Sequence, residues 1–340
     1  VQTCALPIFN HYEKTSFAIP GKGLPLEFTH TYNSFHTELP ESFFITNEGA
    51  LNNQVLANLG IGWSHNYNNY IVFVPGYTYT PDDATNAATT DDKYYIFWGD
   101  GSIEVYNKTK LKFETQGTYK QFYTPSDFIV ITDKSQNFYR FKSLGSLANN
   151  TYVMINMSDR NSNFLNFSYE GASNPGAVRL KMVKDSTTGR SLNYGYQTIN
   201  GKDYLKTVTE SGLGRNVQFN VNSNGDLKTF TDAKGQITEY YYDGTRADQT
   251  HLLTRIKLPK GNIITNTYYQ RKLRSSETNT NKINVNWQNQ YSTAMGQAGS
   301  TVKDNLNRTT TYQYNTSGNP TSIASPTTTV NNIQYGTGNN

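Results

Sequence analysis

The chain has 340 residues and a formal net charge of +4, and 16% of its residues are charged while 14% are aromatic. This weak, dispersed charge does not indicate a protein that binds nucleic acid or an anionic membrane. No stretch approaches the roughly 20 apolar residues of a transmembrane helix. The many Tyr, Phe and Gly residues, without a convincing helical periodicity, predict an all-β protein, because aromatic residues favour strands and Gly favours turns.

The first eight residues, VQTCALPI, contain Cys4, the only cysteine of the chain. They match, in order, the conceptual translation of a common sequencing adapter, and the adapter's leftover base fits a Phe codon, as Phe9 requires. We therefore interpret residues 1–8 as an adapter-like artefact and assign no role to Cys4. The natural chain is then expected to begin further upstream, so the absence of a signal peptide here is uninformative.

Residues 9–110 are irregular, with three segments rich in strand-forming residues: Ile19–Ser34, Leu59–Phe73 and Tyr94–Asn107. We interpret this region as an N-terminal module.

Local patterns predict the conformation of parts of this module. Leu24, Leu26 and Phe28 alternate with polar residues, which predicts a half-buried strand after a Gly/Pro turn. The stretch Gly99–Ser102 contains Asp-Gly, which supplies the positive φ of a tight hairpin turn. Residues Pro81–Asp92 are small, polar and acidic, and they predict an exposed loop.

From residue 111 to residue 340 the chain repeats a short unit in an array. The clearest copy, Thr231–Gly244, has a turn ending in Gly, an alternating strand and then Tyr-Asp-Gly. Copies recur in steps of 20 to 26 residues, with a Gly or Asn that tolerates the left-handed conformation. The turn residues are Gly189, Gly214, Gly235, Gly261 and Asn307, with weaker copies at Asn137, Asn163 and Asn281. A second turn, ending in Gly-Asn or Gly-Asp or similar, contains Gly225, Gly318 and Gly338.

Each repeat predicts one β-hairpin, which must pair with its neighbours because an isolated hairpin is marginally stable. Along one strand, Thr238, Tyr240 and Tyr242 share a face opposite Glu239 and Tyr241. Neither face is purely apolar, so we expect a sheet that is wetted or lined on both sides.

Aromatic residues recur in the strands of the repeats, and the set is Tyr194, Phe219, Tyr240, Tyr242, Tyr312 and Tyr314. We expect them to hold the sheet together through cross-strand pairs. Their interleaving with Arg and Lys leaves carbohydrate as an alternative ligand, whereas no nucleic-acid partner is expected.

These motifs resemble the RHS (YD-repeat) family. The resemblance rests on the Gly-Arg/Gln-x-Thr-x-Tyr strand and the Tyr-Asp-x-x-Gly-Asn turn, and on GLPLEFTHTYNS and LGIGWSHNYNNY, which are similar to the N-terminal module of bacterial members. It covers residues 17–340. The module residues that carry it include Gly23, Tyr32, Gly62 and Trp63.

The resemblance implies a spiral of hairpins that forms a hollow β-shell. In bacterial members this shell encloses a C-terminal toxin domain, which secretion machinery or the cell surface delivers to competing cells. Related repeats in animal teneurins serve adhesion. The family's self-cleavage segment, Asp-Pro-x-Gly-Leu, has no match here, so we expect a chain truncated at the C-terminus, without its cargo, from a protein secreted or displayed at the bacterial surface.

No residue pattern predicts a catalytic, metal or cofactor site. His30 and His36, in THTYNSFH, are interpreted as surface or turn histidines and not as ligands of a metal. His65 lies beside Trp63, where we expect a packed turn.

Two groups of acidic residues lack the motif of a ligand or catalytic site. Asp82 and Asp83, with Asp91 and Asp92, lack the spacing of a calcium loop and predict solvated residues. Glu27 and Glu41 lack the surrounding motif of a glycoside hydrolase.

The sequence leaves three hypotheses for the function. The favoured one is a non-catalytic wall fragment that encloses a toxin domain. The second is a cell-surface adhesin or carbohydrate-binding YD-repeat protein, and an enzyme is the least favoured.

Overall fold

The computed structural model describes residues 10–37, 59–76, 78–79, 88–89, 91–115, 117–144, 150–173, 178–244, 250–269, 272–278, 282–288, 298–303, 308–314 and 320–331. These residues form an all-β protein, as the composition predicts, with one short 3-10 turn, η1 (Ser34–Thr37). In the described ranges, no helix has the length and apolar character to cross a membrane.

A small antiparallel sheet comes from the start of the chain, and we call it the inner sheet. It contains β1 (His11–Ile19), β2 (Leu26–Asn33) and β3 (Trp63–His65), in that order. β2 is the central strand, and most of its residues are buried on both faces. The strand that the sequence predicted after the Gly/Pro turn is confirmed as β2, but it is not half-buried, because structure covers both of its faces.

A large antiparallel sheet contains the other strands, except a separate pair, β5 (Thr78–Tyr79) and β6 (Ala88–Thr89). Within the described residues it has 23 strands. They are β4 (Tyr70–Val74), β7 (Lys93–Phe97), β8 (Ile103–Asn107), β9 (Lys112–Phe113), β10 (Gln121–Tyr123), β11 (Phe128–Thr132), β12 (Phe138–Lys142), β13 (Thr151–Ser158), β14 (Phe164–Gly171), β15 (Val178–Asp185), β16 (Ser191–Ile199), β17 (Lys202–Glu210), β18 (Asn216–Val221), β19 (Leu227–Thr231), β20 (Ile237–Tyr241), β21 (Arg255–Lys257), β22 (Ile263–Tyr269), β23 (Lys272–Thr278), β24 (Lys282–Gln288), β25 (Ala298–Lys303), β26 (Thr309–Tyr314), β27 (Pro320–Ala324) and β28 (Thr329–Asn331).

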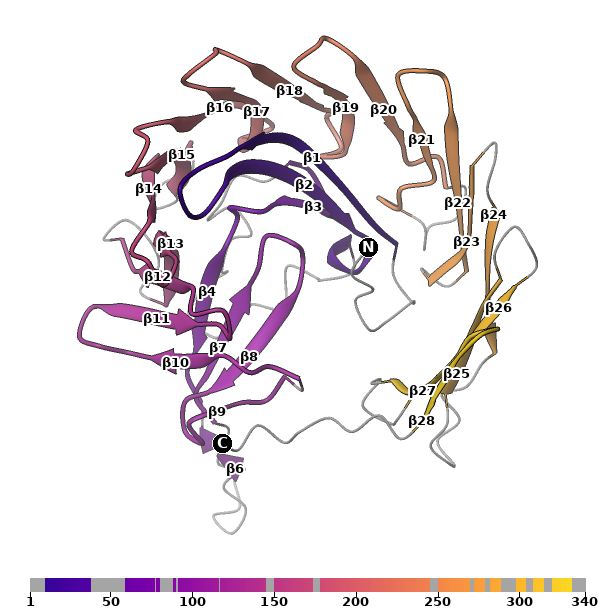
Figure 1. Ribbon diagram of the computed structural model, residues 1–340, viewed down its shortest axis with the longest axis horizontal. Coiled ribbons are helices and arrows are strands. Elements are labelled where there is room, and N and C mark those ends of the chain that lie inside the picture. The colour runs from indigo at the N-terminus through magenta and orange to yellow at the C-terminus, as the bar shows by residue number, and fades with distance from the viewer. Residues whose placement is uncertain are drawn as a thin grey trace.

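From β10 to β28 each strand pairs with the next one along the chain, so the sheet is a continuous series of hairpins. Figure 1 shows this series as an arch around the inner sheet, and we call it the wall. The sheet branches at β13, whose first residues pair with β4, which leads to β7, β8 and β9. The domain boundary expected at residue 110 stays a prediction. β8 and β9 pair across that point, so the sheet continues from one side of it to the other.

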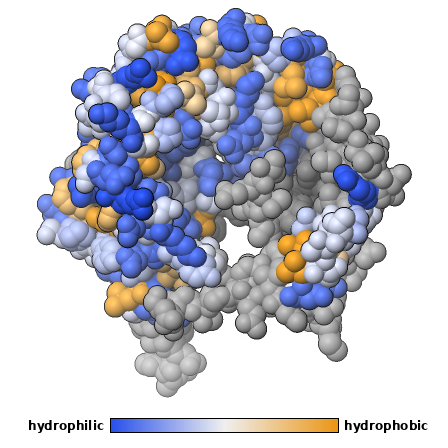
Figure 2. Space-filling model, in the orientation of Figure 1, coloured by the Kyte–Doolittle hydropathy of each residue, from blue (hydrophilic) through white to orange (hydrophobic). Residues whose placement is uncertain are grey.

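The two faces of the wall differ in burial because successive side chains of a strand point to opposite faces. In β18 buried and more exposed residues alternate strictly, and Val217, Phe219 and Val221 are buried. The buried set lies on the concave face, toward the inner sheet. On the convex face, Gln218 of β18 pairs with Thr207 of β17 and Thr231 of β19. Figure 2 shows the rim of the arch as mainly hydrophilic.

The repeat turns place Gly in the left-handed region. Gly189, Gly214, Gly225, Gly235 and Gly261 have φ values between 67° and 85°. In the β19–β20 turn, the amide N–H of Gly235 donates to the carbonyl oxygen of Asp232 at 2.9 Å, and the Asp232 carboxylate accepts from the backbone of Lys234 and Gln236. An Asp or Asn three residues before the left-handed position therefore anchors this kind of turn.

The weaker copies at Asn137 and Asn163 do not have Asn at the left-handed position, and this expectation is wrong. The residues with positive φ are Gln136 (61°) and Ser162 (61°), each one residue earlier. Both follow an anchoring aspartate, Asp133 or Asp159, by three residues, as Gly235 follows Asp232. Asn281 lies outside the described residues.

Replacing Gly235 by Val is expected to lower the free energy of unfolding by about 1–3 kcal/mol. The φ of Gly235 is +77°, which strains a β-branched residue, while a Cβ there would meet no atom within 4 Å. The loss would therefore come from backbone strain and not from a clash. Urea denaturation measures it, and Gly235→Asn, which tolerates this φ, is the matched control; equal stability of the Val and Asn variants would contradict the assignment.

Candidate functional site

The inner sheet packs on the concave face of the wall, and we call this contact the seam. One hydrophobic cluster joins the inner-sheet residues Phe17, Leu26, Phe28 and Trp63 to buried side chains of the wall from β13 to β21. Figure 1 shows the inner sheet lying under the arch of β14 to β21. The seam joins the N-terminal module to the repeats, which lie far from it in the sequence.

The wall contributes the aromatic residues that recur in its strands. Tyr194 in β16, Phe219 in β18 and Tyr240 in β20 are 7%, 2% and 1% exposed, and all belong to the cluster. Their cross-strand partners, including Val208 and Phe230, are also buried. The repeat period therefore places a large side chain of each successive repeat on the same concave face.

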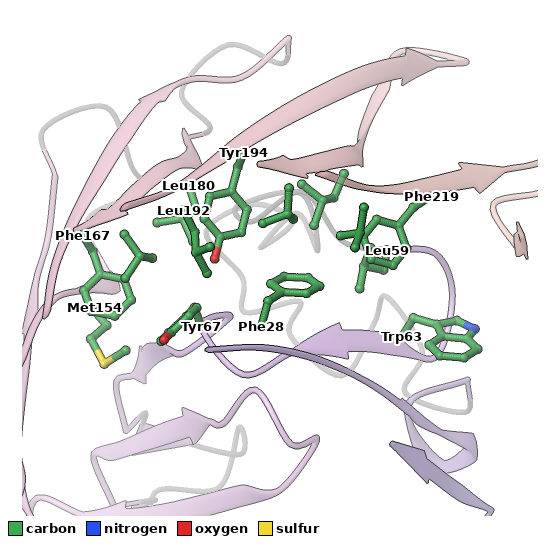
Figure 3. Close-up of a cluster of buried hydrophobic side chains, with 14 of the residues drawn as sticks. Phe28, Leu59, Trp63, Tyr67, Met154, Phe167, Leu180, Leu192, Tyr194 and Phe219 are labelled. Carbon is green, nitrogen blue, oxygen red and sulfur yellow. The ribbon is translucent and has the colours of Figure 1, made fainter. Parts of the chain in front are cut away.

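The inner sheet contributes aromatic residues that lie against this series. The ring centroid of Phe28 is 6.1 Å from that of Tyr194 and 5.8 Å from that of Phe219. The centroid of Trp63 is 4.6 Å from that of Tyr240. Figure 3 shows Phe28 and Tyr67 on the inner side, facing Tyr194 and Phe219 from the wall. Such ring pairs add about 0.5–1.5 kcal/mol each beyond the area they bury.

Hydrogen bonds fix the register of the seam. The indole Nε1–H of Trp63 donates to the hydroxyl of Tyr242 at 2.7 Å, and that hydroxyl donates to the carbonyl oxygen of Leu227 at 2.9 Å. The hydroxyl of Tyr32 donates to the carbonyl oxygen of His251 and accepts from the amide of Leu253. These bonds are directional, so they select one position of the inner sheet along the wall.

Further along the seam, the side-chain amide of Asn10 donates to the hydroxyl of Tyr268 in β22 at 2.7 Å, and that hydroxyl donates to the carbonyl oxygen of Leu253. The polar contacts of the inner sheet therefore extend to β22.

Two histidines of the inner sheet are fully enclosed. His30 in β2 and His65 in β3 are 0% and 2% exposed, and desolvation lowers the pKa of each imidazole from 6.5 to about 3. For His30, the nearby Lys14 and His65 contribute to this lowering of the pKa after desolvation. Nε2 of His30 lies 3.2 Å from the Tyr240 hydroxyl, and its Nδ1 has no hydrogen-bond partner. Both imidazoles are therefore neutral in the folded protein near pH 7.

Three expectations from the sequence are corrected here. The wall is not wetted on both faces, because the inner sheet covers the concave face of its central strands. The aromatics Tyr194, Phe219, Tyr240 and Tyr242 do more than pair across strands, since they pack and bond to a second sheet. His30 is not a surface or turn residue but a buried residue of a central strand.

His65 is buried, as expected, but it lies in a strand and not in a turn. Its Nδ1 accepts the amide N–H of Tyr67 at 3.3 Å. His36 lies in η1, and its side chain is outside the described part of the structure. Tyr312 is a half-buried residue of β26; Tyr314 ends that strand, and its side chain is not described. Asn307, Gly318 and Gly338 also lie outside the described residues.

The glycines of the N-terminal module lie at close contacts with other segments. A Cβ at Gly23 would overlap the carboxylate of Asp159 and the amide of Asn163, which form the β13–β14 turn. Gly62 has a φ of 81°, and a Cβ there would lie 2.8 Å from the ring of Tyr32. Both positions require the absence of a side chain, so the module fits against the wall with little spare space.

Replacing Gly23 by Ala is expected to lower the free energy of unfolding by about 1–3 kcal/mol, because the added methyl must displace the Asp159–Asn163 turn. Gly171→Ala is the matched control, since a Cβ there meets no atom within 4 Å. Thermal denaturation compares the two variants. A Gly23→Ala protein as stable as the control would mean that the module does not contact the wall at this turn.

A cavity of about 360 Å³ lies beside the seam, and residues of the inner sheet, the β7–β8 hairpin and β12–β14 line it. Burial raises the pKa of its Glu27 carboxyl, and the nearby carboxylate of Glu13 raises it further. The other polar side chains here are already engaged: Asn66 bonds the backbone of Thr29 and Glu27, and Asn69 accepts from Gly99. These residues position loops and form no acid–base pair with Glu27.

Asp91 and Asp92 are engaged by lysines. Asp91 forms an ion pair with Lys110 at 2.6 Å and Asp92 one with Lys108 at 3.3 Å. Asp82, Asp83 and Glu41 lie outside the described residues. Within the described ranges, no three His, Cys, Asp or Glu side chains gather as a metal site.

Sequence reasoning missed several residues of the seam, notably Phe28 as an aromatic contact, His30, Tyr67 and Tyr268. A signal existed for two of them: Phe28 and His30 continue the alternation that starts at Leu26. No sequence pattern connects Tyr268 to Asn10, because 258 residues separate them.

Comparisons with known proteins gave structural neighbours only. No protein-family model and no curated protein matches the chain. It is similar to a chain of a Photorhabdus luminescens Tc holotoxin pore, with 8% identity and a TM-score of 0.23, covering 94% of this chain and 23% of that chain. It is also similar to chains of a TcdB2–TccC3–Cdc42 structure (10% identity, TM-score 0.26, coverage 94% and 16%) and a TcdB2–TccC3–TEV structure (9%, 0.22, 93% and 23%). The chain thus spans less than a quarter of each neighbour, and these TM-scores are too low to establish a shared arrangement.

Proposed function

We propose that this chain is a non-catalytic segment of a β wall that encloses another domain of the same polypeptide. The observation that carries the proposal is the seam: a continuous antiparallel sheet curves around a second sheet that is bonded to its concave face. A sheet held in this curvature has the form of a container wall.

The pairing of successive hairpins supports this role. From β10 to β28 the inner strands pair on both sides within the described residues, so few backbone groups are free to pair with another chain. A container benefits from this property, because unpaired strand edges would bind an incompletely folded cargo.

The inner sheet has a specific task in this proposal. Its contacts run along the wall from the turn at Asp159, where Gly23 lies, to Tyr268 in β22. A template that binds so many successive strands fixes the curvature of the wall, since each strand must keep its distance to the same rigid sheet.

The finer part of the proposal is the cargo. The motifs resemble the RHS family, so we propose a C-terminal toxin domain as the enclosed partner, delivered to competing cells by secretion machinery or from the cell surface. The protein would then be secreted or displayed by a bacterium, without cofactor or enzymatic activity in these residues.

The protein encoded by the complete gene provides the test. We expect further repeats after Asn340, followed by a compact domain that resists limited proteolysis in the intact protein and is cleaved faster once the wall is denatured. A gene that ends soon after Asn340, or a downstream domain cleaved equally fast in both states, would contradict the proposal.

A further inference from the structure

We propose that the cavity beside the seam binds a small organic ammonium compound. Its volume of about 360 Å³ is within the usual range of small-molecule sites. Its lining comes from the inner sheet and the loop after β3, from the β7–β8 hairpin, and from β12–β14. The proposal rests on the chemistry of this lining and does not depend on the enclosing role of the wall.

The wall gives the cavity an apolar surface. Tyr139 in β12 pairs with Met157 in β13, and Met157 pairs with Leu165 in β14, so their side chains form one row on the concave face. All three side chains line the cavity. A ring, a thioether chain and a branched alkyl group favour a ligand with an apolar body, because they offer it contact area and few hydrogen bonds.

The inner sheet contributes a carboxylate without a partner. Glu27, near the start of β2, lines the cavity, and its carboxylate forms no hydrogen bond or ion pair with any described residue. Burial is the main cause that raises the pKa of this carboxyl, followed by the nearby carboxylate of Glu13. A cation bound beside Glu27 would offset both effects, since an opposite charge stabilises the ionised form.

The other charged groups of the cavity also favour a cation. Asp100, in the β7–β8 turn, accepts hydrogen bonds from the amide and the hydroxyl of Ser102, and it has no ion pair with a described residue. Lys120 is the one lysine or arginine among the described lining residues, and it pairs with Glu104 at 2.9 Å. An anionic ligand would therefore meet no free cation in this lining, whereas Glu27 and Asp100 attract a positive charge.

Aromatic rings complete the site. Tyr67, Trp98 and Tyr139 line the cavity, and the rings of Trp98 and Tyr139 lie edge to face with their centroids 5.2 Å apart. The ammonium group of Lys120 lies 4.1 Å from the centroid of the Trp98 ring, so this environment already accommodates a cation over an aromatic face. Aromatic faces attract alkylammonium groups, and a carboxylate neutralises their charge. The ligand class is therefore an ammonium group on a short apolar chain.

Titration of the full chain with choline, followed by nuclear magnetic resonance, tests the proposal. We expect a Kd of about 1 mM or lower, and at least about tenfold weaker binding of the neutral isostere in which carbon replaces the nitrogen of choline. Glu27→Gln keeps the shape of the side chain and removes its charge. This variant should weaken choline binding at least about tenfold and leave the weak binding of the isostere unchanged.

Methyl-labelled methionine locates the ligand. The methyl signal of Met157 should shift on addition of choline, whereas that of Met182 in β15, which is not part of the lining, should not. Glu239→Gln is the matched control, because it removes a carboxylate from the convex face of the wall, where Glu239 pairs with Lys257. It should leave choline binding unchanged.

Thermal denaturation verifies that both variants are folded, and the comparison of choline with its isostere uses the unmodified protein. Absence of choline binding, or equal binding of choline and the isostere, would overturn the proposal. So would unchanged binding by folded Glu27→Gln, an equal loss in Glu239→Gln, or a shift at Met182 in place of Met157.

Discussion

Replacing Trp63 by Ala is expected to lower the free energy of unfolding by about 3–5 kcal/mol. Trp63 is 3% exposed, contacts the ring of Tyr240 and donates its indole N–H to Tyr242. The substitution removes this packing, leaves a cavity and deprives the Tyr242 hydroxyl of a partner. A typical domain has a total stability of about 5–15 kcal/mol, so the loss would threaten the folded state itself.

Tyr241→Ala is the control for this prediction, because Tyr241 lies on the opposite face of the wall and pairs with Arg255. We expect it to cost less than about 1 kcal/mol. Urea denaturation measures the free energy of unfolding of both variants. It is monitored by far-ultraviolet circular dichroism, because this signal does not depend on the fluorescence of Trp63. Similar losses for the two, or a minor loss for Trp63→Ala, would show that the inner sheet does not pack on the concave face.

Lowering the pH from 6.5 to 4.5 is expected to destabilise the protein by about 5 kcal/mol. His30 and His65 have a pKa of about 3 in the folded protein and 6.5 as model groups. Below pH 6.5 the unfolded chain binds protons that the folded chain excludes, so the free energy of unfolding falls as the pH falls. The slope is about 1.4 kcal/mol per pH unit for each imidazole, and it ends near pH 3.

The carboxyl groups with a lowered pKa lose their stabilising effect mainly below this window. Hydrogen bonds lower the pKa of Asp133, Asp159 and Asp185 in the folded protein. Such groups stabilise the fold above their unfolded pKa, and they lose this effect only below about pH 4. The range from pH 6.5 to 4.5 therefore reports mainly on the two histidines, whereas the Glu27 carboxyl, whose pKa burial raises, contributes with the opposite sign.

His30→Phe should halve the slope of the free energy of unfolding against pH, because His65 is then the one buried imidazole that stays unprotonated in the folded protein. This expectation does not depend on the stability of the variant at pH 7. His11→Phe, at an exposed position of β1, should leave the slope unchanged. Denaturation curves at several pH values give these slopes. A slope that is flat in the unmodified protein, or equal in it and in His30→Phe, would mean that the imidazoles are hydrated.

The strands and turns of the wall follow from local sequence, and for this reason they could be predicted. The positive φ of Gly235 and the alternation of Thr238, Glu239 and Tyr240 depend only on neighbouring residues. The errors at Asn137 and Asn163 have the same local origin. At both positions the left-handed residue follows an aspartate by three residues, so the Gly-or-Asn marker lies one residue too late.

The seam could not be predicted because its contacts join residues with no relation in sequence. The sequence does not decide whether the Tyr residues of the repeats face solvent or the core, since a Tyr hydroxyl bonds either to water or to a buried acceptor. Only the position of the inner sheet decides between these environments for Tyr240 and Tyr242. In the same way, the pattern around His30 indicated a strand but not the second sheet that encloses it.

A double-mutant cycle between Trp63 and Tyr242 tests the seam most directly, because 179 residues separate the two partners of this hydrogen bond. The cycle compares Trp63→Phe, Tyr242→Phe and the double variant by urea denaturation. We expect a coupling energy of about 0.5–3 kcal/mol between the substitutions. Additivity within about 0.3–0.5 kcal/mol would show that the two side chains do not meet, and the inner sheet would then not lie where this account places it.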